Sequence, residues 1–142
     1  MAYFEWADDM VIDNGPIDED HRILIAQVNA LHTATTLGRG QDVVAQLLGA
    51  IIADTVEHLR REEQLMERAQ FPDLERHKHG HTLFVEKLYD LQKRQHAGSI
   101  TVASQLSTLL RDWLSLHIRR GDKELQRFLQ QQQREQRRVA LK

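Results

Sequence analysis

Six polar side chains in this 142-residue sequence fall at positions where a helical pattern otherwise places apolar ones: His21, His58, Glu62, His77, His81 and His117. A spacing of four residues puts His58 and Glu62 on one helix face. The same spacing puts His77 and His81 on another face, so each pair can direct two ligand atoms at one point. Burying such groups unpaired costs about 1–3 kcal/mol each, whereas a whole domain is stable by only about 5–15 kcal/mol. A bound metal would satisfy them, so the pattern predicts a buried metal site.

Asp122 is a further candidate ligand, but its spacing from His117 is unusual. The two residues are five apart, which an unbroken α-helix would splay by about 140°. We expect Gly121 to adopt a left-handed conformation and end the helix, so that the chain turns and carries the Asp122 carboxylate back toward the histidines. This interpretation fails if Gly121 continues the helix and Asp122 faces solvent.

The types of donor atom narrow the choice of metal. Five imidazoles and two carboxylates are too many ligands for one tetrahedral zinc ion, and they are too rich in nitrogen for calcium or magnesium. Mixed imidazole and carboxylate ligation suits a pair of iron ions that share bridging carboxylates. Ferritin-like di-iron proteins use Glu-x-x-His repeats, and this sequence contains none. The smaller share of carboxylate favours reversible binding over strongly oxidising chemistry.

Four segments with helical periodicity must position these ligands. Their apolar stripes run through residues 17–31, 44–69, 74–91 and 102–117, separated by breaks at residues 38–40, 71–73 and 96–99. Helices of about 20 residues with short connections favour antiparallel neighbours. The sequence therefore predicts an all-α, up-down-up-down antiparallel four-helix bundle.

The length suits a single domain over residues 1–142, which can bury a core without disulfide bonds. Its predicted parts are an N-terminal arm (1–16), the four-helix bundle (17–118) and a short C-terminal helix or tail (122–142). Tyr3, Phe4 and Trp6 are expected to pack the arm against the bundle. We expect Asp18 to cap the first helix.

Composition excludes several classes of function. The absence of cysteine rules out a disulfide scaffold, a thiolate zinc site, an iron–sulfur cluster and a cysteine nucleophile. A formal net charge of −2 argues against nucleic-acid binding. Residues 1–20 are acidic and contain no Lys or Arg, unlike a signal peptide, and no apolar stretch is long enough for membrane insertion. We therefore expect a cytoplasmic protein.

The end of the chain has a different charge balance from the rest. Residues 126–142 carry a formal charge of +4, which leaves −6 for the remainder. Leu125, Phe128 and Leu129 can dock the start of this segment on the bundle. Beyond them we expect a solvated, frayed helix, and an acidic protein partner for the basic tail is the alternative.

The order of the candidate ligands resembles the hemerythrin family, in particular its bacterial single-domain form. The matching segments are Ile17-Asp18-Glu19-Asp20-His21, His58-Leu-Arg-Arg-Glu62, His77-Lys-His-Gly-His81, Asp112-Trp113-Leu114 and His117-Ile-Arg-Arg-Gly-Asp122. The resemblance extends over roughly residues 3–128 and fills every ligand position, so it is specific. It implies a non-haem di-iron protein.

The resemblance also implies a role for each residue. One iron would be held by three histidines and the other by two: His77, His81 and His117 for the first, His21 and His58 for the second. Glu62 and Asp122 would bridge the two irons together with an oxo or hydroxo group. The iron with two histidines would keep an open position at which O2 binds reversibly. The protein would store, deliver or buffer O2 without acting as an enzyme.

Such a site needs dry surroundings, because water or anions at the open position promote oxidation. Leu24, Leu59, Phe84 and Trp113 each lie within four residues of a candidate ligand, and we predict that they line the O2 pocket. Two other functions remain open at this point. One is a module that senses O2, redox state or nitric oxide, and the other is a di-iron enzyme that reduces peroxide or nitric oxide.

Overall fold

The computed structural model describes residues 2–96 and 100–140, and for residues 100–103 it describes the backbone alone. The helices are α1 (Pro16–Thr36), α2 (Gln41–Arg68), α3 (Leu74–His96), α4 (Ile100–Leu116) and α5 (Lys123–Ala140). A short 3-10 turn, η1 (Asp8–Met10), precedes α1, and a π-helical turn, η2 (His117–Asp122), joins α4 to α5. The described residues contain no strand. Most of the turn expected at residues 96–99, and the side chain of Val102, lie outside this description.

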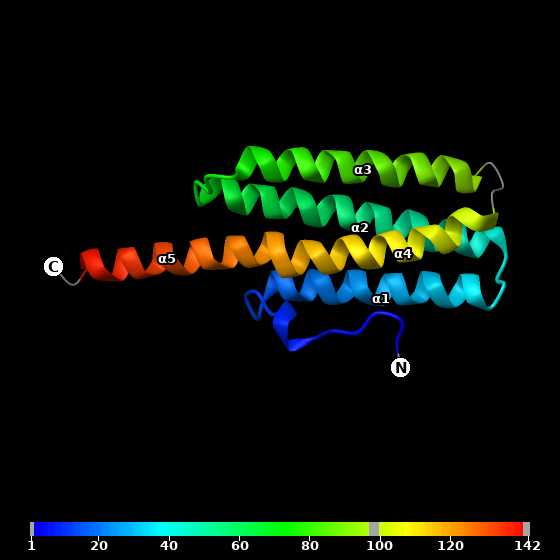
Figure 1. Ribbon diagram of the computed structural model, residues 1–142, viewed down its shortest axis with the longest axis horizontal. Helices are drawn as coiled ribbons and strands as arrows, with labels where there is room; N and C mark the ends of the chain where they lie inside the picture. The colour runs from blue at the N-terminus through cyan, green and yellow to red at the C-terminus, as the bar shows by residue number, and fades with distance from the viewer. Residues whose placement is uncertain (1, 97–99, 141–142) are drawn as a thin grey trace.

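Helices α1 to α4 form the predicted antiparallel bundle (Figure 1). Helix α1 contacts α2 and α4, and α3 contacts the same two helices. The breaks fall where the sequence places them, at Gly38, which has a φ of 66°, and around Pro72. The apolar stripes meet in a core that includes Val28, Leu31, Leu48, Ile51, Leu88 and Leu106. No helix in the described ranges is both long and apolar enough to cross a membrane.

The N-terminal arm packs along α1, as predicted. Phe4 and Asn29 exchange two hydrogen bonds of 2.8 Å, in which each side accepts from an N–H group of the other. The Tyr3 ring stacks on the His32 ring at 3.6 Å between centroids. The Arg22 guanidinium lies 4.4 Å from the centroid of the Trp6 ring. These contacts hold the arm over the surface of α1 (Figure 1).

The prediction that Asp18 caps α1 is wrong. Asp13 performs this role instead, because its carboxylate accepts hydrogen bonds from the backbone N–H groups of Ile17 and Asp18. Asp18 is fully buried and accepts hydrogen bonds of 2.8 Å from the N–H groups of Ile12 and Asn14. Asp18 therefore fixes the path of the arm as it enters α1.

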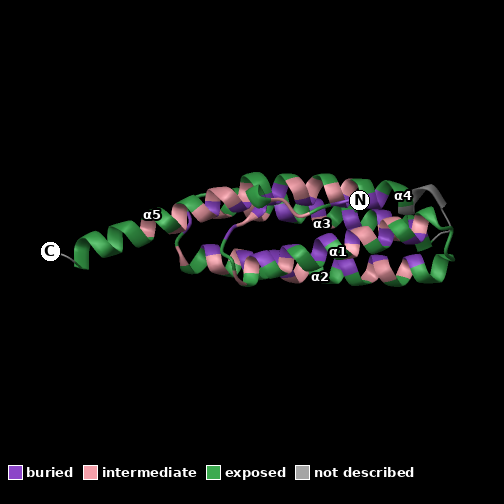
Figure 2. Cartoon of the chain, turned by 90° about the horizontal axis from the view of Figure 1, so that it is seen from below, coloured by how far each residue is buried: buried purple, intermediate pink, exposed green. Residues whose placement is uncertain are grey.

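Helix α5 continues the line of α4 and extends beyond the end of the bundle (Figure 1). Leu125 is fully buried in a small second core with Met66 and Phe71, and Phe128 and Leu129 pack against it, as predicted. Residues 133–140 are all exposed but remain helical, where a frayed end was expected (Figure 2). The second core closes the end of the bundle where α1 and α3 begin.

Candidate metal centre

Five of the predicted ligands converge in the interior of the bundle. One ligand atom from each lies within 4.8 Å of all the others, and all five residues are buried: His21, His58, Glu62, His117 and Asp122. His81 is also buried, and its Nε2 atom lies 3.8 Å from Oε1 of Glu62. His77 lies at the edge, with Nε2 3.5 Å from Glu124 and its ring 6.2 Å from that of His81. The structure thus gathers six of the seven residues closely and places His77 beside them.

The gathered groups direct their ligand atoms at one another. Nε2 of His21 lies 3.1 Å from Nε2 of His58. Nε2 of His117 lies 3.1 Å from Oε2 of Glu62 and 3.3 Å from Oδ2 of Asp122. The same Asp122 oxygen is 2.8 Å from His21 Nε2, but the two are not aligned as a hydrogen bond.

Several buried atoms at this point lack any hydrogen-bond partner. They are Nδ1 of His21, Nε2 of His77 and His81, Oε1 of Glu62, and both carboxylate oxygens of Asp122. In the rest of the described chain only Gln27 and Gln95 contribute such atoms. Because unsatisfied buried polar groups are costly, this concentration favours a bound cation. Imidazole nitrogens mixed with two carboxylates fit a pair of iron ions.

The environment shifts the pKa values of the buried groups. Burial, together with the nearby charges of His58 and His117, lowers the pKa of His21 to about 2. Burial and the adjacent Glu62 carboxylate raise the pKa of Asp122 well above its ordinary value. Burial would also raise the pKa of Glu62, but His117 and His58 outweigh it and hold the pKa well below the ordinary value. A bound cation would favour the deprotonated form of Asp122 and so oppose this shift.

Acid should destabilise the metal-free protein through His21. The unfolded chain protonates this ring near its ordinary pKa of 6.5, whereas in the folded chain the pKa is about 2. The unfolded state binds more protons across that interval, so the free energy of unfolding falls with falling pH, by about 1.4 kcal/mol per unit from this group. Urea unfolding at several pH values should show that the free energy of unfolding depends less steeply on pH in a His21→Leu variant. If the free energy of unfolding of the two metal-free proteins fell equally with pH, the lowered pKa of His21 would be contradicted.

The turn that carries Asp122 differs from the prediction. Gly121 does not adopt a left-handed conformation, and it does not end the helix. Residues 117–122 instead form a single π-helical turn between α4 and α5. The wider i to i+5 repeat of such a turn brings residues five apart onto one face, so Asp122 reaches the histidines while the helix continues. Asp122 does face inward and is fully buried.

Gly121 is needed for space rather than for conformational freedom. A Cβ atom at this position would lie 3.3 Å from Cε1 of His77 and 3.8 Å from Nδ1 of His117. The glycine thus lets α3 bring His77 close to the π-helical turn.

Gly121→Ala should weaken metal retention, although alanine favours a helix over glycine by about 1 kcal/mol. The added methyl group must displace the His77 ring, so we expect iron to pass to a chelator faster than from the wild type. Gly80→Ala is the matched control, because no atom lies within 4 Å of a Cβ there. Equal rates for the Gly121 variant and the wild type would show that His77 tolerates the methyl group.

Sequence reasoning missed two carboxylates beside the candidate ligands. Oδ2 of Asp20 lies 3.2 Å from Nδ1 of His58, and Oε1 of Glu63 lies 3.2 Å from Nδ1 of His81. Each acidic residue stands next to a candidate ligand in the sequence, but each contacts a histidine on the neighbouring helix. Adjacency in sequence therefore gave no indication of which ring each would contact.

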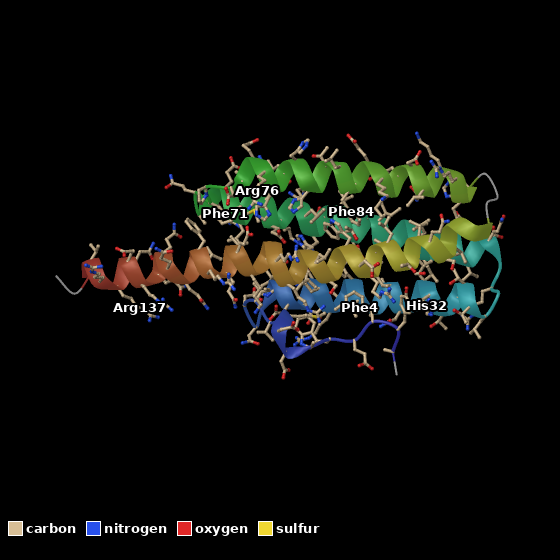
Figure 3. The ribbon with its side chains drawn as sticks, viewed as in Figure 1. Phe4, His32, Phe71, Arg76, Phe84 and Arg137 are labelled. Atoms are coloured by element: carbon tan, nitrogen blue, oxygen red, sulfur yellow. The ribbon has the colours of Figure 1, made fainter. Side chains whose placement is uncertain are left out.

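The residues predicted to line the pocket have different surroundings. Leu24 and Phe84 belong to the main core, and Figure 3 shows Phe84 between the helices of the bundle. Trp113 is partly buried and stacks on His117 at 4.6 Å and on Phe84 at 3.8 Å between ring centroids. Leu59 is buried beside an outer cleft between α2 and α3 that also reaches His81. Their role around O2 stays a prediction.

A larger cleft of about 640 Å³ reaches the site from the end of the bundle. Its lining includes Pro16, Ile17, Asp20, His58, Arg61, Glu62 and Leu65. His58 and Glu62 are therefore the candidate ligands nearest to this opening, and Arg61 stands beside them.

Imidazoles and carboxylates drawn from every side of an antiparallel four-helix bundle define a non-haem metal protein of the helix-bundle class. Residues 15–129 match the hemerythrin HHE cation binding domain, and the chain belongs to the hemerythrin family, which binds a di-iron centre.

Individual relatives agree with this assignment. The chain is 34% identical to a bacteriohemerythrin of Stenotrophomonas maltophilia, over 86% of this chain and 78% of the relative. It is also 34% identical to a bacteriohemerythrin of Methylococcus capsulatus, over 87% and 94%. The crystal structure of a hemerythrin leucine-to-alanine mutant superposes with a TM-score of 0.80 at 30% identity, covering 91% of this chain and 98% of that one.

Proposed function

We propose that this protein binds O2 reversibly at a di-iron centre and stores, delivers or buffers it. The observation that carries the proposal is the group of buried Nε2 and carboxylate oxygen atoms without partners, in a chain of the hemerythrin family. The proposed ligands are His77, His81 and His117 for one iron, His21 and His58 for the other, and Glu62 and Asp122 as bridges. When bound, the two irons would supply the reversible redox chemistry that O2 binding requires.

The protein's own contribution is to hold the ligands and exclude water. Trp113 stacks on the face of His117 with only 10° between the ring planes, which restrains the orientation of that imidazole. Phe84 covers the other face of Trp113. Leu24 lies on α1 one turn after His21 and is buried in the same core as Phe84. These apolar groups keep water from the His117 side and the core side of the centre, whereas His58 and Glu62 line the 640 Å³ cleft.

Leu24→Ala should shorten the time for which the protein can bind O2 in air. The substitution leaves a cavity one helical turn from His21, and water in it would promote oxidation of the iron. The measurement is the loss of reversible O2 binding with time. Leu48→Ala, at a fully buried core position ten residues before His58 on α2, is the control for a general loss of packing. Similar rates of loss of O2 binding for both variants would contradict a role for Leu24 in lining the O2 pocket.

The proposal as a whole is tested by metal analysis and by visible spectra of the reduced protein before and after exposure to air. We expect two irons per chain and an absorption change that reverses when O2 is removed. A single ion per chain, or a change that cannot be reversed, would contradict the proposal.

The same material separates a carrier from an enzyme. A carrier takes up O2 in proportion to its amount, whereas a peroxide or nitric-oxide reductase consumes its substrate continuously with excess reductant. A sensor would instead bind a partner in only one redox state. We propose a carrier without turnover in the cytoplasm, and an acidic protein partner for the basic end of α5 remains an alternative. Arg134, Arg137 and Arg138 are exposed there (Figure 3 labels Arg137).

A further inference from the structure

Two carboxylates contact the Nδ1 atoms of two candidate histidine ligands. Asp20 on α1 lies 3.2 Å from Nδ1 of His58 on α2, and Glu63 on α2 lies 3.2 Å from Nδ1 of His81 on α3. A carboxylate can only accept at these contacts, so each imidazole donates its Nδ1–H group. In the neutral form of each ring, this leaves the Nε2 lone pair on the side that faces Glu62.

The two contacts differ in one respect. Nη2 of Arg61 lies 2.9 Å from Oδ2 of Asp20, the same oxygen that faces His58. In the described part of the chain, Glu63 forms no ion pair with Lys or Arg. Arg61 lines the 640 Å³ cleft beside His58, so its charge sits on one side of the centre only.

We propose that Asp20 and Glu63 are positioning residues of the metal centre, and that Arg61 makes their effects on its two halves unequal. The inference rests on the ligand assignment under the proposed function. Under that assignment, Asp20 acts on the iron held by two histidines, and Glu63 acts on the iron held by three.

The consequence follows from the electron density on the ligands. A carboxylate that accepts the Nδ1–H hydrogen bond fixes the tautomer and makes Nε2 a more basic ligand. A more basic ligand stabilises the more highly charged iron and lowers the reduction potential. Arg61 draws electron density from the Asp20 oxygen and weakens this effect at His58. The iron with the proposed open position is therefore kept easier to reduce than its neighbour.

The test uses substitutions that change charge but preserve size in the iron-loaded protein. Asp20→Asn and Glu63→Gln should each raise the midpoint reduction potential and shift the visible spectrum. Each should also weaken iron retention against a chelator, by about 10- to 100-fold. Arg61→Met should move the potential in the opposite direction, because Asp20 then acts on His58 without competition.

Glu57→Gln and Arg60→Met are matched controls. These residues pair with each other on the exposed side of α2, within a turn of His58. They report the effect of removing a nearby surface charge; Arg60 lines the outer cleft with Glu63 and His81, but its ion pair is with Glu57. The proposal would be overturned if the reduction potentials of Asp20→Asn and Glu63→Gln matched that of Glu57→Gln. A shift of all three test variants in the same direction would also overturn it, because such a shift indicates general disruption.

A second measurement needs no iron and so separates this inference from the proposed function. Nitrogen-15 NMR of the metal-free protein at alkaline pH reports which ring nitrogen carries the proton. We expect the Nδ1–H form at His81 in the wild type, and a mixture in Glu63→Ala. The Nε2–H form in the wild type would overturn the role of Glu63, whether or not the protein binds O2.

Discussion

Replacing His81 by alanine should leave the protein with fewer than two irons per chain. His81 is buried between Glu62 and Glu63, with Nε2 facing the first and Nδ1 contacting the second. Its loss removes one of the three nitrogen ligands proposed for that iron and the contact that the ring makes with Glu63. We expect at least a tenfold weaker hold on the metal, and a lower thermal unfolding midpoint because metal binding stabilises the fold. Metal analysis and calorimetry of the purified variant measure both effects.

His79→Ala is the control for this experiment. His79 lies on the same helix, two positions before His81, but it is exposed to solvent. This variant should keep the wild-type iron content and stability. Two irons per chain in the His81 variant would contradict the ligand assignment.

Removing the metal from the wild-type protein should have the second large effect. The metal-free bundle must bury several polar atoms without partners, all at one point in its interior. At about 1–3 kcal/mol for each such atom, partly shared among neighbours, the loss is on the order of 5 kcal/mol. This approaches the total stability of a typical domain. Denaturant unfolding with and without iron should therefore show well-separated midpoints.

Restoring iron to the metal-free protein should return the midpoint to its original value. Zinc offers a further comparison, since it binds the same donors without redox chemistry. Coincident unfolding curves for the loaded and metal-free proteins would mean that the buried cluster is stable by itself.

The bundle could be predicted from the sequence because its apolar stripes are long and regularly interrupted. Each stripe predicts one helix by itself, and the short breaks at Gly38 and Pro72 restrict neighbours to an antiparallel arrangement. The helical repeat and the apolar pattern were enough to predict that His58 and Glu62 share a buried helix face. Periodicity is a local property, so it places a side chain on a face reliably once the helix exists.

The remainder depended on information that periodicity does not contain. The π-helical turn at His117–Asp122 adds one residue to a repeat, and no residue pattern distinguished it from a helix end at Gly121. The partners of Asp20 and Glu63 lie on neighbouring helices, so their contacts depend on the relative height of the helices in the bundle. The capping role of Asp13 likewise depends on how the arm enters α1.

The π-helical turn joins two properties of the chain that would otherwise be independent. The inserted residue that brings Asp122 alongside His117 also sets the angular phase of everything after it, including Leu125 in the second core. Converting this turn to a regular α-helix without removing a residue would rotate α5 by about 100° about its axis. Leu125 would then turn away from Met66 at the same moment as the Asp122 carboxylate turned away from His117. The geometry of this one turn therefore sets both the packing of α5 and the approach of Asp122 to the histidines.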